Sequence, residues 1–455
     1  MTSNTLRDAD LSYVLHPYTN LVAHETKGPL IAVRGEGVRI FDEKGQDYIE
    51  GMAGLWCASL GFNEPRLVEA ATRQMQTLPF AHMFNHKSHG PGIELAQALI
   101  ERAPVPMARA FFANSGSEAN DTAIKMIWYM NNALGRPEKK KLIARKRAYH
   151  GVTVATASLT SLPANHRDFD LPIDRILHTA CPHYYREAQP GESEDAFARR
   201  LAAELEEMIL AEGPETVAAF FAEPVMGAGG VIVPPETYFQ HIQAVLQKYD
   251  VLLVADEVIC GFGRTGRYWG SQTFDMKPDI LTCAKALSSA YLPISAVLVN
   301  ERVYEALKSN SGKIGTFGHG YTYSAHPVAA AVALETVRLY DERDILGNVA
   351  TSGARMQARL QALTAHPLVG QARGVGLIGA LELVEDKATK RAFDPARAVA
   401  PKVVERAQDH GVILRAMAGD AIAFSPPLII SEAEVDEMID RFTRALDEVT
   451  ADLGA

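Results

Sequence analysis

From about residue 90 onward, two hydrophobic patterns alternate along the chain. Stretches with helical spacing, such as GIELAQALIER (92–102) and AFARRLAAELEEMILAE (196–212), alternate with short runs that are almost wholly apolar: KLIA, VAAFFA, VLLVA, DILTCA and ISAVLVN. Short apolar runs are typical of strands buried on both faces, and strands that alternate with helices form a largely parallel sheet. We therefore predict an α/β fold in which helices cover a mostly parallel sheet.

The two ends of the chain have different patterns. Residues 34–51 (RGEGVRIFDEKGQDYIEG) contain short alternating runs broken by glycine and charged residues, a pattern that predicts a small antiparallel hairpin system. Residues 329–344 predict a long alanine-rich helix that carries the chain out of the parallel sheet. A final helix is expected after Ser431, with Glu434 completing a capping box.

Composition and charge narrow the functional classes. The chain is 47% hydrophobic and 22% charged, and its net charge of -10 disfavours binding to nucleic acid. The basic cluster at 139–147 has an apolar centre and is interpreted as a strand. Four scattered cysteines, a polar N-terminus and the lack of any apolar run of 18 residues predict a cytoplasmic protein without membrane contact.

Two neighbouring apolar runs are each followed by a residue whose side chain could take part in catalysis. VLLVA (251–255) is followed by Asp256, and DILTCA (279–284) is followed by Lys285. The carboxyl ends of parallel strands meet at one edge of the sheet, so both side chains are expected in one crevice. A lysine can form an imine with an aldehyde while a carboxylate pairs with a protonated ring nitrogen, which is what pyridoxal phosphate requires. An aspartate at the sheet edge and a surface lysine are the alternative.

Two further segments suit such a cofactor. In NSGSEANDTAIKMIWYM (114–130), Ser115, Gly116 and Ser117 open a helix, and backbone N–H groups at a helix start can hold a phosphate. A plain helix cap is the alternative. Tyr149 follows the strand at 141–147 and could stack on a flat ring, although a tyrosine at such a place, taken alone, is more often a core aromatic. Val258 is expected on the opposite face of the ring, because strand alternation would point it the same way as Asp256.

Three other motifs are set aside. GFGRTG (261–266) and GVGLIG (374–379) match the dinucleotide pattern, but neither is followed by the helix that the pattern requires. The histidines at 82, 86 and 89 have no carboxylate among them and lie in a short segment between Pro79 and Gly90. We expect no nicotinamide, flavin or metal at these places, and we predict no metal site.

Six motifs in order along the chain resemble the class III aminotransferases, which are pyridoxal phosphate enzymes of fold type I. They are NSGSEAN, AEPVMGAGGVIVPP, LLVADEVICGFGRTG, ILTCAKALS, RGVGLIGALEL and the late Arg415. The resemblance implies a homodimer, possibly a tetramer, with active sites shared at the subunit interface. It also implies a large cofactor domain (60–325) and a small α+β domain built from both chain ends (1–59 and 326–455).

The resemblance also implies roles for particular residues. By it, Lys285 forms the Schiff base with the cofactor and Asp256 pairs with the pyridine nitrogen. Tyr149 and Val258 enclose the ring, and Glu223 lies near its phenolic edge. The phosphate is expected to be held by Ser115, Gly116, Ser117 and, from the neighbouring subunit, Thr322.

At one position the sequence differs from related branches of the family, and this difference narrows the class of substrate that is expected. In the ornithine and 4-aminobutyrate branches, the glycine-rich loop carries a second glutamate that pairs with the late arginine, and here that position looks like Ala228. Arg415 is therefore expected to be free for a substrate carboxylate. Trp56 and Ala228 together resemble the amine:pyruvate branch, the omega-transaminases, in which aromatic residues line the amine pocket. Core packing is the alternative for Trp56.

The expected reaction is a ping-pong transamination. An amine or omega-amino acid would give its amino group to the cofactor and leave as an aldehyde or ketone, and pyruvate would then take the group and leave as alanine. A decarboxylase, aminomutase or racemase on the same scaffold stays open, as do a nicotinamide-dependent dehydrogenase and a non-enzymatic binding protein. The physiological amine donor is not predicted.

Overall fold

The computed structural model describes residues 5–454, which are built around a seven-stranded sheet. Its strand order is β4-β10-β9-β8-β7-β5-β6, and only β10 runs antiparallel to its neighbours. The mostly parallel sheet is therefore confirmed. The strands are β4 (Arg109–Ala113), β5 (Lys141–Arg145), β6 (Ile176–Thr179), β7 (Val217–Ala222), β8 (Leu252–Asp256), β9 (Ile280–Cys283) and β10 (Ser295–Val299).

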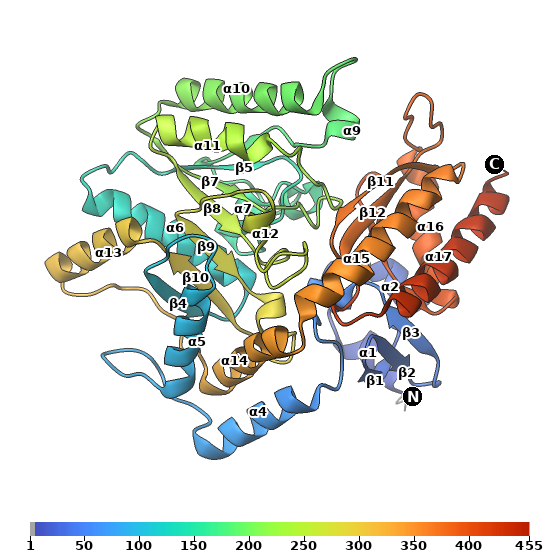
Figure 1. Ribbon diagram of the computed structural model, residues 1–455, viewed down its shortest axis with the longest axis horizontal. Helices are drawn as coiled ribbons and strands as arrows, with labels where there is room; N and C mark the ends of the chain where they lie inside the picture. Colours follow the sequence, from blue (N-terminus) through green and yellow to red (C-terminus); the bar gives the residue numbers. More distant parts are fainter. Residues whose placement is uncertain (1–4, 455) are drawn as a thin grey trace.

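Both faces of this sheet are buried under helices. Because successive side chains of a strand point to opposite faces, Phe220 of β7 packs with α10 (Glu194–Glu212) and α11 (Tyr238–Lys248), whereas Phe221 packs on the other side. That side is covered by α6 (Gly116–Ala133), α7 (Val154–Leu159) and α13 (Glu301–Ile314). Figure 1 shows α10 and α11 together above the sheet, with α6 and α13 at its other side.

A third group of helices packs beside β9 and β10. It comprises α4 (Pro65–Thr77), α5 (Gly90–Glu101) and α14 (Pro327–Glu342), and α14 lies against both of the others. The alanine-rich helix predicted at 329–344 is therefore confirmed as α14 (Figure 1). Because α14 packs on helices of the predicted large domain, the division of the chain at residues 59 and 325 stays a prediction.

The two ends of the chain meet in one region, at the right of Figure 1. The N-terminal strands β1 (Ala32–Glu36), β2 (Arg39–Asp42) and β3 (Asp47–Glu50) pair in sequence order, and β3 also pairs in parallel with β13 (Val412–Ile413) of the C-terminal part. A second, antiparallel sheet has the order β11-β12-β15-β14. Its strands are β11 (Val369–Val375), β12 (Ile378–Leu383), β14 (Arg415–Met417) and β15 (Ala421–Phe424), and α15 (Ile345–Ala362), α16 (Val399–Asp409) and α17 (Glu432–Leu453) pack on these sheets.

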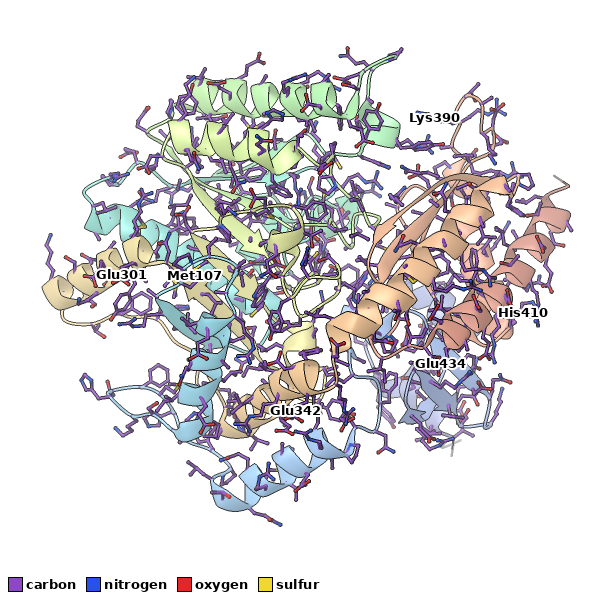
Figure 2. All side chains as sticks on the ribbon, in the orientation of Figure 1. Met107, Glu301, Glu342, Lys390, His410 and Glu434 are labelled. Atoms are coloured by element: carbon purple, nitrogen blue, oxygen red, sulfur yellow. The ribbon has the colours of Figure 1, made fainter. Side chains whose placement is uncertain are left out.

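Capping and short helices complete the fold. The capping box at the start of α17 is confirmed, since Ser431 and Glu434 each accept from the other's backbone N–H (Glu434 is labelled in Figure 2).

In the loop after β12, Lys390 Nζ donates to Tyr185 O and joins the two parts of the molecule (Figure 2). The short helices are α1 (Leu6–Tyr13), α2 (Leu21–Lys27), α3 (Ala53–Trp56), α8 (Pro163–His166), α9 (Tyr184–Glu187) and α12 (Gly270–Thr273).

The motifs that were set aside have structural roles. GVGLIG forms the turn between β11 and β12, and GFGRTG is a series of turns packed against it, with Leu377 N donating to Arg264 O at 3.1 Å. His89 caps α5 by accepting from Gly92 N. All four cysteines are free. Within residues 5–454, no helix combines the length and apolar character needed to cross a membrane.

Candidate active site

Adjacent parallel strands bring Asp256 and Lys285 to the same cavity. Asp256 is the last residue of β8 and lies opposite Thr282 of β9, after which Lys285 opens a single turn of 3-10 helix. Lys285 has a φ of 47°, in the left-handed region where a residue other than glycine is strained, and such strain gathers at functional sites. Both residues line a cavity of about 140 Å³. The predicted meeting of the two side chains is therefore observed.

A hydrogen-bond network holds the Asp256 carboxylate, which is only 3% exposed. Its Oδ2 accepts from Asn120 Nδ2 and His150 Nδ1, both at 2.7 Å, and its Oδ1 accepts from Val258 N at 3.1 Å. Asn120 in turn accepts from Thr282 Oγ1 and donates to the His150 carbonyl, at 2.8 Å in both cases. The carboxylate is thus fixed in position by three donors, and one of them, the Asn120 side chain, is itself held by two further hydrogen bonds.

Lys285 carries an amine without a hydrogen-bond partner among residues 5–454. Burial lowers its pKa from the ordinary 10.5, although Asp256 acts in the opposite direction. The Nζ atom lies 5.6 Å from the centre of the Trp56 ring. A buried amine with a lowered pKa and a free lone pair is suited to nucleophilic attack and to proton transfer.

The start of α6 forms one wall of the cavity. Gly116 and Ser117 line it, whereas Ser115 is exposed and caps the helix by accepting from Glu118 N at 3.1 Å. A Cβ atom on Gly116 would lie 2.9 Å from Val258 Cγ1, so a side chain there would crowd Val258, which also lines the cavity. Free N–H groups and the dipole at a helix start favour an anion at this end of the cavity.

Tyr149, Val258 and Glu223 also line the cavity. Val258 reaches it for a different reason from the one predicted: β8 ends at Asp256, and Val258 lies in the following turn, where strand alternation no longer applies. Glu223 accepts from Tyr149 N at 3.1 Å and from Gly227 N at 3.0 Å, and burial raises its pKa. The glutamate therefore ties the tyrosine to the glycine-rich loop.

Arg415 on β14 is a cation beside an aromatic ring. Its Cζ lies 5.2 Å from the centre of the Trp56 ring, and Trp56 is only 3% exposed. Among residues 5–454, no carboxylate lies within ion-pair distance of Arg415, whose pKa burial lowers. Ala228 packs against the same apolar cluster as Trp56 and brings no charge. The predicted absence of a resident carboxylate beside Arg415 is therefore observed.

Thr322 is exposed in the loop between α13 and α14 and does not line the cavity of its own chain. The resemblance to the class III aminotransferases implied that Thr322 reaches the cofactor of a neighbouring subunit, and that role stays a prediction. Of the predicted cofactor residues, only Ser115 and Thr322 lie outside the cavity lining.

Sequence reasoning missed several residues that line the cavity, above all Asn120 and His150. The sequence contained a signal that could have identified each of these two residues. Asn120 closes the NSGSEAN motif one helical turn after Gly116, and His150 directly follows Tyr149. Their contact with Asp256 depends on how β5, β8 and α6 meet, which no local pattern reports.

The residues around the cavity fit pyridoxal phosphate. They offer an amine without a partner for the aldehyde, a buried carboxylate for the ring nitrogen and a helix start for the phosphate. A tyrosine and a valine are available for the two faces of a flat ring.

Comparison with known proteins agrees with this chemistry. The family model for aminotransferase class-III matches residues 21–446. Gamma aminobutyrate transaminase 1, mitochondrial, from Solanum lycopersicum is 52% identical over 436 residues, which cover 96% of this chain and 84% of that protein. Gamma-aminobutyrate transaminase 1, mitochondrial, from Oryza sativa subsp. japonica is 49% identical over 434 residues, covering 95% of this chain and 84% of that protein.

Solved structures are similar over nearly the whole chain. The omega transaminase from Pseudomonas jessenii in complex with PMP has a TM-score of 0.98 and 56% identity, covering 99% of each chain. A transaminase with L-ala has a TM-score of 0.92 and 61% identity, covering 93% of this chain and all of that one. The chain therefore belongs to the class III aminotransferases of fold type I, and its cofactor is pyridoxal phosphate.

Proposed function

We propose that the enzyme moves an amino group from an amine or omega-amino acid to pyruvate, giving an aldehyde or ketone and alanine by a ping-pong mechanism. The observation that carries this proposal is the Arg415 guanidinium, which lies beside the Trp56 ring and has no carboxylate partner among residues 5–454. A keto acid brings the carboxylate that the arginine lacks, and a bidentate pair would orient it.

We infer the following residues for the cofactor. When bound, pyridoxal phosphate withdraws electrons from the bonds at the amine-bearing carbon of the substrate. Lys285 would hold its aldehyde carbon, Asp256 would face its ring nitrogen and Glu223 would lie near its phenolic edge. The ring faces are assigned to Tyr149 and Val258, and the phosphate to Ser115, Gly116, Ser117 and the partner subunit's Thr322.

Proton transfer is assigned to Lys285. Its Nζ lies in the cavity without a hydrogen-bond partner, and burial lowers its pKa, so the uncharged amine can accept a proton and return it. Asn120 and His150 hold Asp256 in place. Asp256 could therefore keep a proton on the ring nitrogen of the cofactor. In this assignment Lys285 is the mobile base and Asp256 is the fixed anion.

Trp56 and Ala228 would shape the pocket for the amine. Both belong to one apolar cluster, which also contains Met52, Val231 and Met417. An apolar wall favours the alkyl or aryl part of a donor, and the small Ala228 leaves Arg415 without an internal partner. The solved relative that contains L-ala supports alanine as the product of the second half-reaction.

A second donor class has its own support. Curated relatives at 49 to 52% identity are named gamma-aminobutyrate transaminases, and 4-aminobutyrate is an omega-amino acid. Its carboxylate could pair with Arg415 in the first half-reaction, just as pyruvate would in the second. The proposal therefore includes 4-aminobutyrate among the donors, with pyruvate as the acceptor in either case.

The test is a donor panel read as alanine produced. Holoenzyme is given a neutral arylalkylamine, 4-aminobutyrate or β-alanine, each with pyruvate, with 2-oxoglutarate or with no acceptor, and Lys285→Ala enzyme serves as the control. We expect alanine from at least one donor with pyruvate and none from the control. Consumption of the donor without any acceptor would favour a decarboxylase, aminomutase or racemase, and turnover with 2-oxoglutarate alone would overturn the choice of pyruvate.

We also propose a homodimer with shared active sites and a cytoplasmic location. The exposed Thr322, which lies outside the cavity of its own chain, supports sharing of the site. The four free cysteines fit a reducing compartment, although the names of the curated relatives place those proteins in mitochondria and chloroplasts. A fluorescent fusion of the full chain, with markers for each compartment, tests the location.

A further inference from the structure

Two histidines contact one carboxylate in the N-terminal segment, which comprises α1, α2 and the loop between them. Neither α1 nor α2 has a buried residue, and every residue from 12 to 27 except His16 and His24 is exposed. Both imidazole rings contact the carboxylate of Asp10 of α1. The contacts to Asp10 therefore join α1, the loop after it and α2.

The three side chains converge closely. His16 Nε2 lies 2.9 Å from Asp10 Oδ2, His24 Nε2 lies 3.1 Å from Asp10 Oδ1, and the ring centres of the histidines are 4.1 Å apart. Their ligand atoms all lie within 4.8 Å of one another, and the side chains are between 13% and 26% exposed. In a tetrahedral zinc site with bonds of about 2.0 to 2.1 Å, neighbouring ligand atoms are about 3.3 Å apart.

The donor set also has the chemistry of a metal site. Two imidazole nitrogens and one carboxylate oxygen are ligands that zinc accepts, with a water molecule in the fourth position. A bound cation would join α1, the loop after it and α2 at one point. We propose that Asp10, His16 and His24 bind a divalent cation of the zinc type, which closes the N-terminal segment.

Such a cation would also fix the loop between the two histidines. That loop carries Tyr18, whose hydroxyl accepts from Asn165 Nδ2 and lies near Tyr149 of the active-site cavity. The sequence analysis did not identify this site, because the spacing of Asp10, His16 and His24 matches none of the metal-binding patterns considered. The histidines at 82, 86 and 89, which were considered, do not converge on a common point.

Hydrogen bonding alone is the competing explanation, and one substitution separates the two. Each imidazole can donate its Nε2–H to Asp10 without any metal, whereas a metal needs the Nε2 lone pair, so that the proton must lie on Nδ1. Asp10→Asn keeps an oxygen that accepts from the histidines but removes the anionic ligand. It should therefore preserve the folded segment and weaken metal binding.

The experiment uses chelator-treated, dialysed holoenzyme titrated with ZnCl2, with binding followed by calorimetry and bound zinc counted by elemental mass spectrometry. We expect one tight zinc ion per chain in the wild type and in the matched control His86→Ala, which removes an exposed histidine elsewhere. In Asp10→Asn and His24→Ala the affinity should fall roughly 100-fold or more.

A second measurement keeps the test independent of folding. Zinc should slow proteolysis between residues 14 and 20 in the wild type but not in Asp10→Asn, while the melting temperatures without zinc stay equal. The proposal is overturned if the wild type binds no zinc ion tightly, or if Asp10→Asn binds zinc and is protected as well as the wild type.

Discussion

At the scale of single residues, Arg415 is the residue to which we assign the specificity for a keto acid. It is a largely buried cation beside Trp56, and no carboxylate of residues 5–454 neutralises it. Arg415→Ala should therefore raise the KM for pyruvate by roughly 10- to 100-fold, since a hydrogen bond to a charged group contributes about 1.5 to 3 kcal/mol. The KM for a neutral amine should change much less. Steady-state kinetics with each substrate varied in turn provide the measurement.

Arg415→Lys is the matched control, because lysine keeps the positive charge but lacks the planar guanidinium group. It should recover only part of the affinity for pyruvate, because an ammonium cannot form the bidentate pair. If Arg415→Ala raises both KM values equally while the melting temperature falls, Arg415 is structural and the specificity argument is wrong.

The lowered pKa of Lys285 leads to a prediction about pH. Burial disfavours the charged ammonium, so the reactive uncharged amine becomes populated at a lower pH than the ordinary 10.5 of lysine. Reconstitution of apoenzyme with pyridoxal phosphate should therefore accelerate as pH rises and level off below pH 10.5. Visible absorbance against time at each pH gives the rate. A rate that keeps rising up to pH 10.5 would show that burial does not tune this amine.

Residues at strand ends were predictable, and residues that hold them were not. Asp256 and Lys285 follow apolar runs, so their meeting at the sheet edge needs only the rule that parallel strands end together. Asn120 and His150 reach Asp256 from α6 and from the loop after β5. Their convergence depends on helix and strand packing, which leaves no local pattern in the sequence.

At the scale of elements, the start of α6 is the sensitive point. A Cβ on Gly116 would lie 2.9 Å from Val258 Cγ1, and both residues line the cavity. Gly116→Ala should push these walls apart at a cost of about 1 to 3 kcal/mol, so the affinity for the cofactor should fall roughly tenfold or more. Fluorescence titration of apoenzyme with pyridoxal phosphate measures this change.

Gly312→Ala is the matched control for this substitution. Gly312 lies in α13, and an added Cβ would meet nothing within 4 Å. Because alanine favours the helix over glycine, this variant should be unchanged or up to about 1 kcal/mol more stable, with normal cofactor affinity. Equal cofactor affinity in the two variants would contradict the account of α6.

Element types were easier to predict than the reasons for particular contacts. The buried strands, the alanine-rich α14 and the capped α17 followed from periodicity and capping residues. Val258 was placed at the cavity by strand alternation, yet β8 ends two residues earlier and a turn directs it there. A sequence pattern gives a strand but not its last residue, and alternation cannot be extended beyond that point.

At the scale of the whole molecule, the two chain ends come together in one region. β13 pairs in parallel with β3, so residues near 412 lie beside residues near 49. Hydrophobic patterning indicates that each is a strand but does not specify the partner. That arrangement came instead from the resemblance, carried by motifs spread over the chain.

Assembly is the prediction at this scale. If active sites are shared, the enzyme should have a mass of at least twice the 49.5 kDa chain, and the mass should not change over the working concentration range. Light scattering after size exclusion measures it. Full activity of a species with the mass of one chain would contradict the sharing of sites.

The most direct test of the central claim is to find where the cofactor is attached. Holoenzyme is reduced with borohydride, digested and analysed by mass spectrometry. The account predicts a single modified peptide that carries reduced pyridoxal phosphate on Lys285, with the visible absorbance band lost in Lys285→Ala. An unmodified Lys285, or an unchanged absorbance band in that variant, would contradict it.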